Sequence, residues 1–129
     1  MNNEYYTLYF CSEELVLSEQ IKISKSFSGS KISDIVENIL IDKLKINPKK
    51  INNIEETTGV YDFVIPRLKP LEAISWLSNY ARPTGSGING TTGADMVFFE
   101  NKDGYKFASL SSMLAQPTIW KYKYQQNNL

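Results

Sequence analysis

The sequence contains no histidine and a single cysteine, Cys11, among its 129 residues. Without histidine the chain lacks the commonest general base and the commonest metal ligand, which argues against a hydrolytic triad and a zinc site. One cysteine excludes an internal disulfide framework. Its position in a strand-like segment predicts a small buried hydrophobe rather than a nucleophile. Carboxylate chemistry, which needs only aspartate and glutamate, is the form of catalysis that stays open.

Net charge and long apolar runs are also missing. Fourteen Lys and Arg balance fourteen Asp and Glu, so no global field would attract nucleic acid or an acidic membrane. No segment approaches the roughly 18–20 apolar residues that span a bilayer, and the first residues lack the basic start and apolar run of a signal peptide. We therefore expect a protein that is made and kept in a cytoplasm, or assembled there into a particle.

The residues that are present describe an ordinary globular domain, with 42% hydrophobic and 22% charged side chains. Apolar residues recur at three- and four-residue intervals over about 31–46, which predicts an amphipathic helix that Ser30 caps and Pro48 ends. A second helix is predicted over about 70–82, with proline at its first position. The length fits one domain, residues 1–129.

Strands are predicted between and around these helices. A hairpin is expected near 95–108 because two apolar segments flank the turn residues Asn101–Gly104. A brief helix is expected over 109–114, and the segment 83–94, rich in Gly, Ser and Thr, is expected to be a flexible loop. Further strands are predicted from aromatic content or alternation at 4–11, 20–27, 60–65 and 119–124. The predicted class is α+β, with antiparallel strands and two main helices.

One apparent dinucleotide-binding motif lies in the wrong structural context. Gly85–Gly90 matches G-x-G-x-x-G letter for letter. A dinucleotide-binding loop follows a strand and opens a helix, whereas here a helix precedes the motif and a strand follows it. The motif is therefore interpreted as part of the loop, and no cofactor is expected.

Acidic residues could form a carboxylate pair for glycoside cleavage. Neighbouring acidic residues on exposed loops are far commoner than catalytic pairs, so we expect no enzyme. The groups considered are Glu55 and Glu56 with Asp62, and Asp95 with Glu100 and Asp103.

Aromatic residues are numerous, with eight Tyr, six Phe and two Trp. Those on the terminal strands could stack oligosaccharides or nucleic acid, or they could belong to a protein–protein interface. The neutral net charge disfavours nucleic acid, since phosphate contacts dominate such affinity. We favour core and interface roles for these aromatics, which include Tyr5, Tyr6, Tyr9, Tyr122 and Tyr124.

The order of the segments resembles that of T-even-type phage baseplate hub proteins. Asp95–Leu110 is similar to the hairpin of that family. The first strand of that hairpin ends in two aromatic residues and a glutamate. Three residues later the pattern continues with glycine, an aromatic residue, any residue, Phe, any residue, Ser and Leu. Ile65–Leu77 is similar to its proline-led helix, and Tyr6–Phe10 with Ser26–Leu40 to its earlier strand, turn and helix. The same layout occurs in the hub half of type VI secretion spike proteins. The matching residues are Pro66, Ile74, Leu77, Phe98, Phe99, Glu100, Gly104, Tyr105, Phe107, Ser109 and Leu110.

The resemblance implies a mechanical role. Hub proteins form a homotrimer whose duplicated barrel-like domains make a pseudo-sixfold ring between the threefold spike and the sixfold tail tube. The implied partners are the protein itself, tail-tube proteins and spike proteins, with no membrane and with nucleic acid only as passing cargo. The implied location is the virion baseplate, assembled in the host cytoplasm. Because full-length hubs are several times longer, this chain would be one part of such a protein.

Two other functions stay open. The first is a small protein- or glycan-binding module that uses exposed aromatic strands. The second is a cell-wall-degrading enzyme carried by a baseplate, which requires two carboxyl groups about 5–10 Å apart across a cleft.

Overall fold

The computed structural model describes residues 3–85 and 95–125. The helical segments are α1 (Glu13–Gln20), α2 (Ile32–Asn38), its π-helical continuation η1 (Ile39–Lys43), the 3-10 turn η2 (Pro48–Lys50), α3 (Pro70–Ser78) and α4 (Leu110–Leu114). The strands are β1 (Ile23–Ser30), β2 (Ile51–Ile54), β3 (Tyr61–Leu68), β4 (Met96–Asn101) and β5 (Gly104–Ser109). Helices are combined with one antiparallel and one mixed sheet, which confirms the predicted α+β class.

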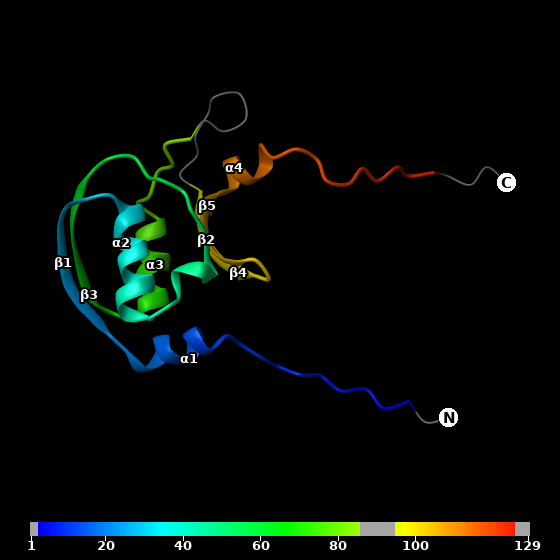
Figure 1. Ribbon diagram of the computed structural model, residues 1–129, viewed down its shortest axis with the longest axis horizontal. Helices are drawn as coiled ribbons and strands as arrows, with labels where there is room; N and C mark the ends of the chain where they lie inside the picture. The colour runs from blue at the N-terminus through cyan, green and yellow to red at the C-terminus, as the bar shows by residue number, and fades with distance from the viewer. Residues whose placement is uncertain (1–2, 86–94, 126–129) are drawn as a thin grey trace.

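The elements form three layers. Strands β1 and β3 pair antiparallel in a two-stranded sheet, and a second sheet has the order β2-β5-β4, in which β2 is parallel and β4 antiparallel to β5. Helices α2 and α3 lie between the two sheets (Figure 1). Both described ends of the chain leave on the side of the β2-β5-β4 sheet, away from β1 and β3.

The middle layer contains the centre of the core. Six apolar residues of α2, η1 and the turn after them are at most 1% exposed, because their spacing places them on one helical face. Burial of each such side chain contributes about 1.5–3 kcal/mol relative to exposure. Leu77 of α3 and Phe107 of β5 complete this core. The six residues are Ile32, Ile35, Val36, Ile39, Leu40 and Leu44.

The first predicted helix is present, but its ends differ from the prediction. Ser30 does not cap it, because this residue still belongs to β1 and pairs with Tyr61. Instead Thr57, distant in sequence, accepts a hydrogen bond from the Ser33 amide at 3.0 Å. The last turn is π-helical, and the left-handed backbone of Lys45, with φ 53°, ends it before residue 46.

The second predicted helix is shorter than expected. Its start is as predicted, with Pro70 at the first position and the Glu72 carboxylate accepting from the Lys69 amide at 3.3 Å. The helix ends at Ser78 rather than 82. Tighter turns follow, in which the Tyr80 amide donates to the Leu77 carbonyl at 3.0 Å.

The hairpin and the brief helix after it are confirmed. Strands β4 and β5 pair in one unbroken register from Met96↔Ser109 to Asn101↔Gly104. Ser109 caps α4, since its hydroxyl accepts from the Ser112 amide at 3.1 Å.

The strands β1 and β3 begin and end later than predicted. The pair Ser28-Gly29 does not end β1, because a bulge with Gly29 at φ 57° carries the strand on to Ser30. Likewise β3 continues through Pro66 to Leu68. This is possible because β3 is an edge strand of its sheet.

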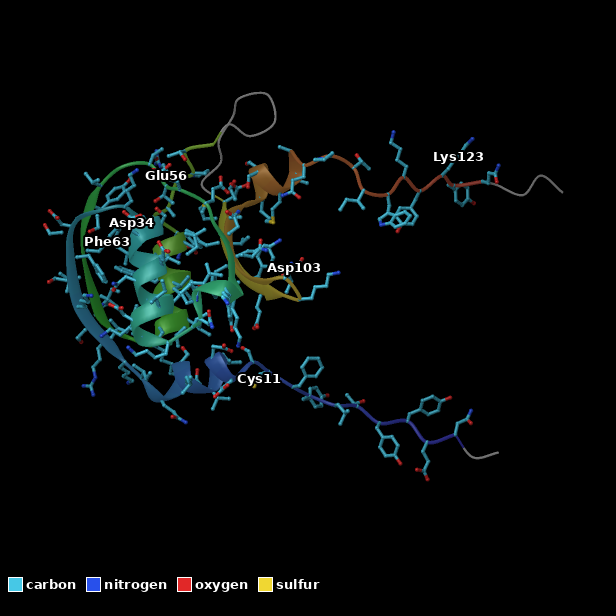
Figure 2. All side chains as sticks on the ribbon, viewed as in Figure 1. Cys11, Asp34, Glu56, Phe63, Asp103 and Lys123 are labelled. Carbon is cyan, nitrogen blue, oxygen red and sulfur yellow. The ribbon has the colours of Figure 1, made fainter. Side chains whose placement is uncertain are left out.

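Both terminal strand predictions are wrong. Residues 3–12 and 119–125 form no strand in the structure, and the side chains of 3–11 and 119–125 are exposed. Cys11 is therefore exposed rather than buried. Figure 2 shows Cys11 on the N-terminal segment and Lys123 on the C-terminal one, with Asp103 at the hairpin turn between them. Helix α1 was not predicted, because the polar residues Ser12 to Glu14 at its start were interpreted as an interruption between two strands.

The predicted loop over 83–94 lies largely outside the described residues. At its start, Pro83 forms an isolated bridge with Thr57, and the Thr84 amide donates to the Glu56 carbonyl at 3.0 Å. Within residues 3–85 and 95–125, no helix has the length and apolar character needed to cross a bilayer.

Candidate functional site

The residues that carry the family resemblance gather where α3 packs on the hairpin. Ile74 and Leu77 of α3 and Phe107 of β5 are fully buried. Phe98 of β4 stacks on Tyr105 of β5, with ring centroids 5.8 Å apart and an interplanar angle of 5°. The pattern therefore describes the contact between one helix and one hairpin, and not a set of reactive groups.

Gly104 has a local structural reason for its place in this pattern. Its φ of 118° lies in a region that favours glycine, and an added Cβ would stand 2.1 Å from the Lys50 carbonyl oxygen. Other members of the pattern face outward. Pro66, Glu100 and Leu110 are exposed, and Phe99 is half-buried.

The Tyr105 hydroxyl is buried beside Ser12 and Glu14 but lies outside hydrogen-bonding geometry with any described group. Burial is the main cause that raises its pKa above the usual 10.0. The hydroxyl therefore keeps its proton at physiological pH, and Tyr105 is a neutral phenol of the core.

Glu55 forms a dense set of hydrogen bonds with the start of α4. Its carboxylate accepts from the Ser109 amide at 2.7 Å, the Ser109 hydroxyl at 3.0 Å and the Ser112 hydroxyl at 2.7 Å. Asp95 accepts in the same region from the Ser111 amide at 3.2 Å. Both carboxylates thus satisfy amides of the first helical turn, which is a structural role.

Of the remaining acidic candidates, Glu100 and Asp103 are exposed at the end of the hairpin, whereas Asp62 and Glu56 are bound within the chain. Asp62 accepts from the Ser28 hydroxyl at 2.7 Å and the Gly29 amide at 2.8 Å, and these bonds hold its pKa below the usual value. Glu56 pairs with Lys31, whose hydrogen bond lowers the pKa of Glu56 in the same way. A general acid needs a raised pKa, so the shifts of these two carboxyls go in the opposite direction.

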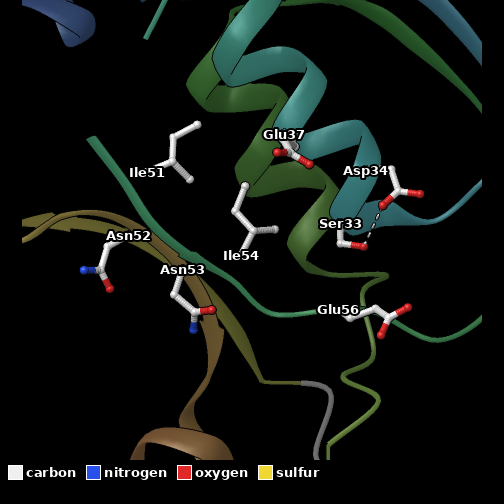
Figure 3. A pocket seen from close by; sticks show the side chains of 8 residues that line it. All are labelled: Ser33, Asp34, Glu37, Ile51, Asn52, Asn53, Ile54 and Glu56. Atoms are coloured by element: carbon white, nitrogen blue, oxygen red, sulfur yellow. Dashed lines mark hydrogen bonds between the residues drawn. The ribbon is translucent and has the colours of Figure 1, made fainter. Parts of the chain in front are cut away.

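An open hollow of about 370 Å³ lies between α2 and β2 (Figure 3). Three carboxylates, from Asp34, Glu37 and Glu56, stand around it, with Ser33 donating to Asp34 at 3.4 Å. Among residues 3–85 and 95–125, no group of three or more His, Cys, Asp or Glu has the geometry to hold a metal ion.

An aromatic cluster between β3 and the C-terminal end of α3 was not predicted. Phe63 of β3 contacts Tyr61, Trp76 and Tyr80, with each pair of centroids 5.6–5.7 Å apart. Trp76 and Tyr80 are themselves 5.4 Å apart. The i, i+4 spacing of Trp76, on α3, and Tyr80, in the turn after it, was visible in the sequence. Their contact with β3 depends on tertiary packing, so spacing alone does not reveal it.

The most unusual surfaces are the two terminal segments, here called the N-terminal arm (residues 3–12) and the C-terminal arm (residues 117–125). The large apolar side chains of the N-terminal arm are 80–95% exposed, and those of the C-terminal arm are 75–94% exposed. Isolated exposed hydrophobes are normal, whereas contiguous runs of them mark contact sites. The residues are Tyr5, Tyr6, Leu8, Tyr9 and Phe10, and Ile119, Trp120, Tyr122 and Tyr124.

A scan against protein-family models and searches of curated proteins and of solved structures find no significant match to this chain.

Proposed function

We propose that this chain is a structural module of a contractile phage-tail baseplate hub, which links spike and tail tube through contacts between subunits. The observation that carries the proposal is the pair of aromatic arms. Nine large apolar side chains on two arms are between 75 and 95% exposed, and aromatic residues are enriched where proteins bind one another. The arms are therefore segments that another polypeptide covers.

The rest of the molecule is consistent with a mechanical role. The buried residues of the hub pattern, Ile74, Leu77 and Phe107, belong to the packing of α3 on the β4–β5 hairpin, and both arms leave on the side of that hairpin (Figure 1). A packed core between two sheets gives the arms a firm base. The carboxylates Glu55, Asp62 and Asp95 serve in intrachain hydrogen bonds. Assembly, rather than turnover of a substrate, is the function that this distribution supports best.

The first test is the solution mass of the intact chain, measured by light scattering over a wide concentration range. A homotrimer is expected, with three times the monomer mass of 14.7 kDa. Purified tail-tube and spike proteins of a contractile-tailed phage, immobilised separately, should then retain the chain. A monomer at every concentration that neither protein retains would overturn the proposal.

A second function, a small protein- or glycan-binding module, is favoured by the aromatic cluster around Phe63. A hollow of about 400 Å³ adjoins it, lined by Tyr61, Phe63 and Tyr80 together with polar groups of Asp62, Asn79 and Arg82. Aromatic faces with a few convergent polar groups are typical of ligand sites. Tyr80→Ala should abolish binding in a glycan-array or peptide-array screen if this function is correct. A wild-type chain that binds no member of either array would exclude it.

A further inference from the structure

The two sheets leave several strand edges open, and most of these edges are protected. In the β1–β3 sheet, β3 carries Pro66 and a left-handed Arg67 with φ 53°, and β1 is interrupted by two register shifts. In the other sheet, β2 has only four residues and one register shift. Proline, bulges and short length are the devices that stop an edge from pairing with another strand.

Strand β4 has none of these devices. Its six residues, Met96–Asn101, keep an unbroken register with β5 and contain no proline. Among the described strands it is the one regular edge whose backbone groups are free to pair. A regular, apolar edge of this kind is a template for another strand.

The hydrogen-bond pattern shows which backbone groups of β4 face outward. The Leu110 amide donates to the Asp95 carbonyl at 3.1 Å, so these two residues are a hydrogen-bonded pair of the ladder. Because such pairs alternate along antiparallel strands, the amides of Met96, Phe98 and Glu100 point away from β5. These amides are the donors available to an added strand.

A groove accompanies this edge. At one end, a hollow of about 330 Å³ lies between Met96, Val97 and Phe98 of β4 and the α3 residues Leu71, Ser75 and Ser78. At the other end, a hollow of about 440 Å³ lies between Glu100 and Asn101 of β4 and residues 10–12 at the base of the chain's own arm. A strand added to β4 would place alternate side chains into these hollows, which is how strand addition obtains specificity.

The N-terminal arm has the matching chemistry. Residues 5–10 equal β4 in length, contain no proline and carry apolar side chains at five of six positions. Their sequence favours a strand, yet they form no strand with the described residues. Beyond Phe10, which lines the hollow beside Glu100, the arm projects from its own domain (Figure 1). The base of the arm is held in place, since Glu14 of α1 pairs with Lys50 at 2.8 Å and the Ser18 hydroxyl accepts from the Leu71 amide at 3.1 Å.

We propose that residues 5–10 of one copy add as a fourth strand to the open edge of β4 in a second copy of this chain. This inference rests on the proposed function and supplies the contact by which subunits associate. An arm-to-edge contact joins two different surfaces, so it propagates head to tail and ends when the ring closes. Three copies would close the proposed homotrimer.

Two proline variants of the full chain test the contact. Thr7→Pro prevents strand formation by the arm, and Glu100→Pro removes an outward amide of β4 without removing a bond to β5. Each variant alone should be a monomer by light scattering, with at least about a tenfold weaker association. Lys121→Pro, in the C-terminal arm, is the matched control and should associate like the wild type. Circular dichroism checks that each variant is folded, and Glu100→Lys replaces Glu100→Pro if proline disturbs the hairpin.

Mixing the two variants gives the sharpest test. An equimolar mixture contains intact arms on Glu100→Pro chains and intact edges on Thr7→Pro chains, so it should form heterodimers and nothing larger. Absence of heterodimers would overturn the inference. If the wild type associates but both proline variants do so equally, the inference fails and the proposed assembly function stands. If the wild type is a monomer whose arm is protected from deuterium exchange, the arm closes on its own β4, and association through this contact is excluded.

Discussion

Two segments of this chain have similar strand-forming sequences and opposite fates. Gly104–Ser109 and Tyr5–Phe10 both contain closely spaced aromatic residues, but Phe107 is fully buried whereas Phe10 is 95% exposed. Strand β5 lies between β2 and β4, so its backbone groups have partners on both sides. The N-terminal arm pairs with no strand in the described part of the chain. The comparison shows that a strand-like sequence becomes a strand only where the fold supplies an edge for it.

The largest expected effect is a difference in the free energy of unfolding between a substitution in β5 and one in the N-terminal arm. Phe107→Ala should lower the free energy of unfolding by about 3–5 kcal/mol, because it leaves a cavity in the core. Phe10→Ala, its matched control in the arm, should change that free energy by less than about 0.5 kcal/mol. Urea denaturation at a concentration where both proteins are monomers gives the two values. Equal losses would mean that the arm packs on its own domain.

A second prediction concerns close backbone approach at the turn of the buried hairpin. Gly104→Ala should lower the free energy of unfolding by about 2–3 kcal/mol, since its Cβ would meet the Lys50 carbonyl oxygen and its φ is 118°. Gly29→Ala is the control, because its φ of 57° is also positive but nothing lies within 4 Å of the added atom. A loss of about 1 kcal/mol is expected there. Thermal unfolding compares the stabilities of the two variants. A larger loss of stability in Gly29→Ala than in Gly104→Ala would contradict this reasoning.

A third prediction concerns the carboxylate that holds α4 against the hairpin. Glu55→Gln should cost about 1–3 kcal/mol, since an amide group cannot accept all three hydrogen bonds from Ser109 and Ser112. Glu37→Gln, at an exposed position of α2, should have almost no effect. Chemical denaturation monitored by circular dichroism compares them. A negligible loss in Glu55→Gln would show that α4 is not held through this carboxylate.

The smallest effect is a pH dependence at the base of the N-terminal arm. The hydrogen bond from Lys50 lowers the pKa of Glu14 below its usual 4.5. A lowered folded-state pKa gives stability that is present above the unfolded value and is lost as the pH falls through the folded one. Lys50 is 57% exposed, so the contribution is about 1 kcal/mol or less.

The wild type should therefore be more stable than Glu14→Gln at neutral pH. This difference should shrink as the pH falls below 4.5 and through the lowered folded-state pKa of Glu14. Urea titrations of the two proteins at neutral pH and at a series of acidic pH values measure it. A difference that persists in acid would assign the contribution of Glu14 to packing instead of charge.

Several features of the fold were predictable because their signals are local. The apolar spacing that leads to α2, proline at the start of α3, and the turn at Asn101–Gly104 each act within a few residues. The Thr57 hydroxyl accepts the hydrogen bond of the Ser33 amide from 24 positions away in the sequence, so no local pattern indicates this contact. Helix α1 was missed for a similar reason, since its contacts with Lys50 and Leu71 are distant in sequence.

The candidate surfaces divide in the same way. The aromatic content of the arms was evident from the sequence, and so was the interpretation that such residues serve an interface. Three features follow from strand order and packing. The arms form no strand with the described residues, Phe63 contacts aromatic residues of β3, of α3 and of the turn after α3, and β4 is the regular open edge among the described strands.

By itself the sequence determined the α+β class, the two main helices and the hairpin, because periodicity and turn residues act over short distances. Tertiary structure alone decided which strand-like segments became strands, where the helices end, and which carboxylates serve as caps. A strand needs hydrogen-bond partners from elsewhere in the chain, and burial depends on what packs above each residue. Those partners are chosen only when the whole chain has folded.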